Sequence, residues 1–241
     1  MMSPRLNEIW VYLAASPLIG LTATLIAYVF AFRIYERARY SPLANPVMIS
    51  VAILVTVLTV TGTPYKTYFD GAQFVHFLLG PATVALAVPL YTQLPKLRAH
   101  AFPLLCGLVA GSLVAVVSAV GIGYALGASP EVVRSLAPKS VTIPIAMGVS
   151  EKIGGLPSLT AVLVMATGII GAVSATGLLN MLRVRDYVIR GFATGVAAHG
   201  IGTARAFQVN QEAGAFAALG MGLNGVLTAI VVPVLAAWMP H

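Results

Sequence analysis

Residues Pro138–Pro157 read PKSVTIPIAMGVSEKIGGLP, and this stretch decides how the surrounding chain folds. It lies between two apolar runs, 101–128 and 158–182, yet it is too polar for a simple membrane span and too apolar for an ordinary loop. Its internal Pro144 removes a backbone donor, and non-helical backbone at membrane depth persists only inside protein or along a wet cavity. The stretch therefore predicts a broken, re-entrant segment beside an internal polar site, with a packing kink as the rival interpretation.

The composition places the whole chain in a membrane. Its 241 residues are 59% hydrophobic and 9% charged, with a mean hydropathy of +0.91, whereas soluble domains average about 25% charged residues. So few charges cannot cover a solvated surface, which excludes an ordinary soluble enzyme, a disordered chain and a nucleic-acid-binding protein. The net charge of +7 instead indicates basic loops on one face of the membrane.

We expect an all-α, polytopic helical membrane protein that forms one integral membrane domain over residues 1–241. A spanning helix needs about 20 residues, and the apolar runs predict about seven spans in addition to the broken stretch. The predicted spans are 9–32, 47–61, 72–91, 101–128, 158–182, 191–209 and 214–236.

Basic residues predict the orientation of these spans. Loops 33–46, 92–100 and 183–190 hold eight of the 14 Lys and Arg residues, which predicts that all three lie in the cytoplasm. The N-terminus is then outside. The C-terminus is inside if 191–209 crosses the membrane fully, and the sequence leaves open whether this segment crosses or re-enters.

Two interrupted spans suggest an inverted repeat. Segment 72–91 contains Gly80-Pro81 and segment 191–209 contains four glycines, and each is the middle member of a triplet of spans. Interrupted segments at matching places in two inverted halves are typical of secondary transporters. The halves would be 47–128 and 158–236. Small residues at a spacing of four also favour close helix packing or a homodimer.

The first charged cluster contains Lys139, Ser140 and Thr142. Pro138 and Pro144 bracket it, so we expect an extended strip with the two hydroxyls on one side and a short helix after it. Lys139 would bind a carboxylate as a point charge, and the hydroxyls would donate to the same anion. The rival interpretation is an outer loop with a solvated lysine.

The second cluster is Ser150-Glu151-Lys152. A desolvated Glu151 beside cations is a candidate proton carrier, because burial and neighbouring charges shift its pKa in opposite directions. The rival interpretation is a solvated Glu–Lys pair at the end of a helix.

The third cluster contains His199, Thr203 and Arg205. Arginine offers a rigid fork that matches a carboxylate, and a histidine can take up a proton in the physiological range. A structural histidine and an arginine that extends toward the membrane surface are the rivals. His76 is a further candidate, although a histidine in a span more often bonds a neighbouring helix.

Several absences narrow the function. The sequence has no H-E-x-x-H, P-loop, G-x-S-x-G or C-x-x-C motif. Because it also has one cysteine and seven carboxylates, we expect no enzyme activity, no metal site and no cofactor.

The sequences HFLLGPATVALAVPLY at 76–91, KSVTIPIAMGVSEKIGGLP at 139–157 and AHGIGTARAF at 198–207 resemble the LrgB/CidB family. The resemblance runs almost end to end and implies the bacterial inner membrane. Where the family pattern has a second threonine, this chain has Ile143.

The resemblance implies two functions. One is a holin/antiholin-like role in murein hydrolase export and autolysis, with a small LrgA/CidA-type membrane partner. The other is transport of small monocarboxylates such as pyruvate or glycolate, as in the related plastidial glycolate/glycerate translocator. Because breaks and charges coincide at 138–155 and 199–205, we favour the transporter, with Lys139 and Arg205 as the carboxylate ligands.

Overall fold

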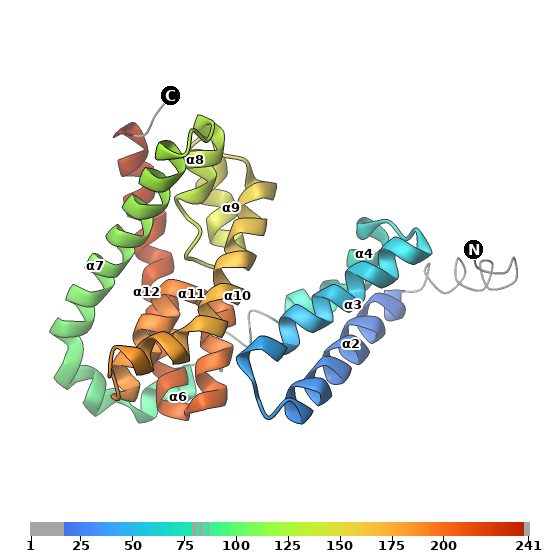
Figure 1. Ribbon diagram of the computed structural model, residues 1–241, viewed down its shortest axis with the longest axis horizontal. Coiled ribbons are helices and arrows are strands. Elements are labelled where there is room, and N and C mark those ends of the chain that lie inside the picture. The colour runs from blue at the N-terminus through green and yellow to red at the C-terminus, as the bar shows by residue number, and fades with distance from the viewer. Residues whose placement is uncertain (1–16, 79–80, 82–83, 86, 239–241) are drawn as a thin grey trace, which may run out of the picture. The chain divides into compact units, whose positions relative to one another are not determined.

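A computed structural model describes residues 17–78, 81, 84–85 and 87–238, and every regular element in these ranges is a helix (Figure 1). This confirms the all-α prediction. The chain divides into two compact units, residues 1–85 and 86–241. Because the predicted repeat half 47–128 falls in both units, the single domain and the inverted repeat stay predictions.

The first unit contains α2 (Pro17–Arg37), the short 3-10 helix η1 (Pro42–Ala44), α3 (Pro46–Thr61) and α4 (Tyr65–Phe77). Helix α2 packs against both α3 and α4, and the hydroxyls of Thr24 and Tyr68 bond across the α2–α4 contact at 2.7 Å. Asn45 caps α3 by accepting from the backbone N–H groups of Val47 and Met48.

The second unit holds the remaining helices. They are α6 (Ala87–Thr92), α7 (Leu94–Ala125), α8 (Pro130–Leu136), α9 (Ile143–Lys152), α10 (Pro157–Met181), α11 (Tyr187–Val209), α12 (Gln211–Leu235) and η2 (Ala236–Trp238). At one end of the unit Lys96 of α7 forms an ion pair with Glu212 of α12. At the other end Val116 of α7, Val149 of α9 and Val232 of α12 share an apolar cluster.

Four of the described helices are long and apolar enough to cross a membrane: α2, α7, α10 and α12. The chain is therefore a multi-pass membrane protein, and the predicted count of seven spans stays a prediction. Helices α3, α10 and α12 match the predicted spans 47–61, 158–182 and 214–236 to within three residues at each end. The predicted span 72–91 overlaps the end of α4 and most of α6, and the break predicted at Gly80-Pro81 stays a prediction because residues 79–80, 82–83 and 86 lie outside the described residues.

The first half of α11 runs parallel to the start of α12. A methyl group on Gly191 would overlap the carbonyl oxygen of Ala213, and one on Gly195 would overlap that of Ala217. In each pair the two contacting residues are 22 positions apart in the sequence. The two helix segments are therefore parallel. Glycine is required at both positions because the helix backbones touch.

The second half of α11 runs back along α12. Thr203 contacts Met221 through its hydroxyl at 3.8 Å from Sδ, and Phe207 packs on Gly214. As residue numbers rise in α11 they fall in α12, so these segments are antiparallel. The reversal occurs at His199, whose φ of 42° and ψ of −133° are non-helical. Helix α11 is therefore a re-entrant hairpin.

This hairpin decides the topology that the sequence left open. Residues 187 and 209 lie at the same end of the second unit, so α11 enters and leaves on one side. Helix α12 then crosses toward α8 and α9, and the two ends of the unit are visible in Figure 1. The C-terminal end of α12 is consequently on the side opposite to loop 183–186.

The segment between α8 and α9 differs from the extended strip that we expected. Residues 137–140 form successive turns, with the N–H of Lys139 bonded to the carbonyl of Leu136 and that of Val141 bonded to the carbonyl of Pro138. Only Thr142 has extended backbone angles. The strip was a wrong prediction because these local bonds satisfy the backbone inside the protein better than extended chain would.

The closeness of α11 and α12 predicts the effect of one added methyl group. Gly195→Ala forces the two backbones apart and should destabilise the fold by about 1–3 kcal/mol. Gly121→Ala on α7 is the matched control, because a methyl there meets no atom within 4 Å. SDS-driven unfolding in mixed micelles measures both variants. Equal stability of the two would contradict the packing described for α11.

Candidate functional site

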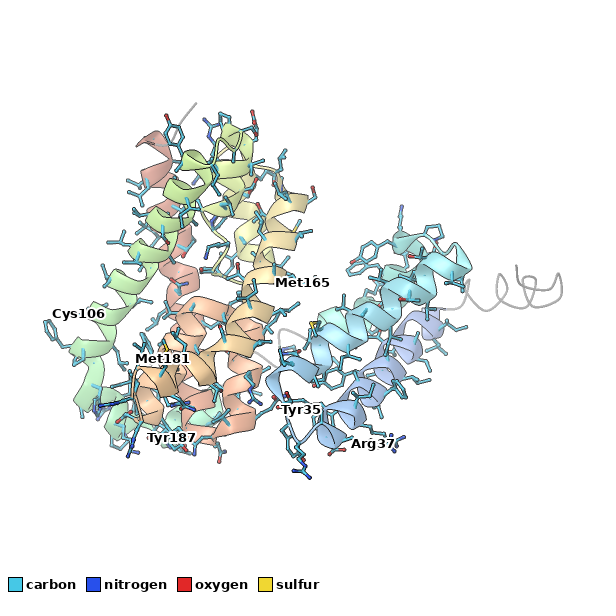
Figure 2. All side chains as sticks on the ribbon, viewed as in Figure 1. Tyr35, Arg37, Cys106, Met165, Met181 and Tyr187 are labelled. Atoms are coloured by element: carbon cyan, nitrogen blue, oxygen red, sulfur yellow. The ribbon has the colours of Figure 1, made fainter. Side chains whose placement is uncertain are left out.

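A cavity of about 760 Å³ lies between α7, α10 and α11 in the second unit. Such a volume is within the range of small-molecule sites. Small residues on each helix make the space: Gly107 and Gly111 on α7, Gly171 on α10, and Ala193 and Ala197 on α11. Figure 2 labels Cys106 on α7 and Tyr187 at the start of α11, two of the helices that form the walls.

Two of the predicted site residues, Lys139 and Ser140, line this cavity. They come from the turns between α8 and α9, and the ammonium of Lys139 donates to the Ser140 hydroxyl at 3.4 Å. His100 of α7 also lines the cavity, and its Nδ1 donates to the carbonyl of Lys96 at 2.8 Å. Most of the remaining wall is apolar, as with Leu104 and Phe192, so the cavity combines an apolar body with a few polar groups.

Asn224 of α12 ties the two interrupted segments together. Its side chain is 1% exposed, and its Nδ2 donates to the carbonyl of Ser140 at 3.1 Å and to that of Val196 at 3.0 Å. A carbonyl freed by a helix break has no water to bond at membrane depth. Asn224 supplies the missing donors. It thereby holds the turns at 137–140, which contain Lys139, against α11.

His199 occupies the turn of the α11 hairpin. Its ring Nε2 donates to the carbonyl of Val164 on α10 at 2.9 Å, and its own carbonyl accepts from the hydroxyl of Thr203 at 2.8 Å. The side chain is 3% exposed. A positive φ is costly for a residue with a Cβ, so these bonds hold a strained turn. His199 and Thr203 therefore both have structural partners, and their roles in substrate binding stay predictions.

The structure does not bring Arg205 to the cavity of Lys139. Arg205 lines a separate, much smaller cavity with Arg190 and Thr194, at the entry level of the hairpin. The physical reason is the reversal at His199, which carries Arg205 back along α11 instead of onward. A bidentate carboxylate site shared by Lys139 and Arg205 is not formed in this arrangement.

The second predicted cluster also lies outside the cavity. Ser150 is buried and accepts at 2.7 Å from the hydroxyl of Thr160, whereas Glu151 and Lys152 are exposed at the end of α9. Thr142 precedes α9 at its N-cap position, without a capping bond from its side chain. The predicted His76 lies in α4, and its side chain is outside the described residues.

Sequence reasoning missed Thr167 of α10 and His100 of α7, which both line the cavity. Thr167 is one hydroxyl in a long apolar run, and nothing in its spacing distinguishes it from other threonines in the spans. His100 stands four residues after Lys96 at the start of α7, where a loop position was predicted. Among the described residues no group of three or more His, Cys, Asp or Glu side chains could hold a metal ion.

Comparisons with known proteins identify similar sequences. The profile of the LrgB-like family matches residues 24–238. Uncharacterized protein YwbG of Bacillus subtilis is 34% identical over 92% of this chain and 98% of its own length. Antiholin-like protein LrgB of Bacillus mycoides is 30% identical over 90% of this chain and 95% of its own length. No solved structure matches the chain.

The position of Asn224 predicts a large cost for its loss. Asn224→Leu keeps the side-chain size but leaves the carbonyls of Ser140 and Val196 without their donor, at about 1–3 kcal/mol for each buried group. Leu223→Ala is the control, because this neighbouring α12 side chain is exposed. SDS-driven unfolding should show a clear loss of stability for Asn224→Leu alone. A fold as stable as the wild type would mean that Asn224 does not connect the segments.

Proposed function

The chain belongs to the LrgB-like family, and we propose that it is an antiholin-like membrane protein that regulates murein hydrolase export and autolysis. The observation that carries this proposal is the near full-length similarity to proteins named antiholin-like protein LrgB. A homodimer and a small LrgA/CidA-type membrane partner belong to the same proposal.

The packing of the second unit supports a regulator over a lesion-forming protein. Pore-forming peptides need only amphipathic helices that lie in the membrane interface. This chain instead holds α11 and α12 in backbone contact at Gly191 and Gly195 and connects its breaks through Asn224. Helices packed this closely hold one defined conformation, which suits recognition of a specific partner protein.

A second candidate function is facilitated transport of small monocarboxylates, and the cavity favours it. A monoanion would place its carboxylate beside the ammonium of Lys139 and its apolar body against Leu104 and Phe192. A second carboxylate among these apolar walls would have to give up its water without an equal replacement. The cavity is therefore better suited to a monocarboxylate than to a dicarboxylate.

The antiholin-like role predicts a phenotype in cells. Expression in a bacterial strain that lacks its own LrgB protein should slow autolysis and lower the murein hydrolase activity released into the medium. Autolysis is followed by the fall in culture turbidity after detergent challenge, with empty vector as the control. Unchanged autolysis in cells that contain the folded protein would contradict this role and leave transport as the remaining candidate.

The transport candidate predicts a different result in proteoliposomes. Lys139→Ala removes the cation of the cavity and should lower initial uptake of labelled pyruvate about 10- to 100-fold, which is the factor expected for one bond to a charged group. Lys152→Ala is the matched control, since Lys152 is exposed at the end of α9. Equal uptake by both variants, or no uptake by the wild type, would contradict carboxylate transport through this cavity.

A further inference from the structure

The hydroxyl of Thr167 is an unused polar group in the cavity wall. Among the described residues it makes no hydrogen bond, although it lies in the middle of α10. Helical hydroxyls usually donate to the carbonyl four residues earlier. Ser174 of the same helix does so at 2.7 Å, and Thr194 of α11 does so at 2.7 Å. Thr167 thus keeps both its donor and its acceptor capacity for something inside the cavity.

The packing of α10 places Thr167 close to the end of the cavity that Lys139 occupies. Val164 shares an apolar cluster with Val141, which lies two residues after Lys139. Thr167 follows Val164 by three residues, so it lies on the same face of α10, about 4.5 Å further along the helix axis. A ligand whose carboxylate meets Lys139 and whose body extends into the cavity therefore passes Thr167 directly.

Two other hydroxyls of the second unit, one of them in the cavity wall, have partners. The Ser140 hydroxyl accepts from the Lys139 ammonium, and the Thr203 hydroxyl donates to the carbonyl of His199. Beyond Thr167 the next turn of α10 presents Ile170 and Gly171, which offer no polar side chain. Ser140 is the other hydroxyl among the described residues of the cavity wall, and it lies beside Lys139, where the carboxylate would bind. Thr167 is therefore the hydroxyl that a ligand would meet further along the cavity.

We propose that Thr167 is a specificity-determining residue that recognises an oxygen substituent on the carbon next to the carboxylate. This inference rests on the proposed binding of monocarboxylates in the cavity. A hydroxyl can donate to a keto oxygen and can exchange a hydrogen bond with another hydroxyl. A site with such a group prefers ligands that carry the matching oxygen, because a ligand without it leaves this half-buried hydroxyl unpaired.

The test compares lactate with propionate, which share a carbon skeleton and differ by the 2-hydroxyl group. Their dissociation constants are measured for the full chain in nanodiscs by competition against labelled pyruvate. The wild type should bind lactate more tightly than propionate. Thr167→Val keeps the branched shape without the hydroxyl, and it should weaken lactate binding about 10-fold and leave propionate binding unchanged.

Thr167→Ser is the matched control and should restore the preference for lactate, because it restores the hydroxyl. Unchanged propionate binding reports that the valine variant is folded. A valine variant that keeps the wild-type preference overturns the role of Thr167 and leaves carboxylate binding intact. An equal loss for both acids also overturns it, since that result indicates a change of shape. Absence of binding of either acid to the wild type overturns the proposed site as a whole.

Discussion

A helix that breaks inside a membrane must find partners for the backbone groups that the break frees, and this constraint governs the second unit. Asn224 donates to carbonyls of both interrupted segments, Ser140 and Val196. The ring of His199 bonds a carbonyl of α10, and Thr203 bonds the carbonyl of His199 itself. Since lipid offers no hydrogen bonds to the freed backbone groups, the fold requires these contacts.

The same contacts create the candidate site. Because Asn224 holds the turns at 137–140 against α11, Lys139 lines a cavity whose other walls are mostly apolar. Glycine and alanine residues on α7, α10 and α11 leave this volume free of side chains, and the hairpin of α11 keeps Arg205 out of it. This site has one cation beside apolar walls. The sequence motifs instead suggest a site in which Lys139 and Arg205 both bind the carboxylate. For the proposed binding of monocarboxylates, this site takes one negative charge, and hydroxyl groups would select among the acids.

The sequence predicted the breaks well, because proline and glycine act locally. Pro144 stands in the first turn of α9 and Pro157 begins α10, and the glycines of 191–209 marked the second irregular segment. It did not predict that α11 turns back. That reversal depends on contacts of Gly191 and Gly195 with the α12 backbone, and the same glycine spacing is compatible with a straight helix that packs closely.

Arg205 lies in a different cavity from Lys139 for that reason, and its role in binding stays a prediction. Six residues beyond His199, a straight helix would continue to a different depth from the one that the hairpin gives it. Thr167 could not be found from sequence either, since its distinction is a missing internal hydrogen bond. The sequence did point to Lys139, which lines the cavity, because a lysine between two prolines in an apolar chain is costly unless it has a partner or a role; its part in binding stays a prediction.

The re-entrant hairpin is most directly tested by the distance between its two ends. Spin labels at Arg185→Cys and Val209→Cys, in a chain whose exposed Cys106 is replaced by serine, allow pulsed dipolar spectroscopy in nanodiscs. The hairpin predicts a distance of about 10–20 Å, because two packed helices lie 8–10 Å apart and the labels add to that spacing. A distance of about 36 Å, the rise of a continuous helix from residue 185 to residue 209, would contradict the account.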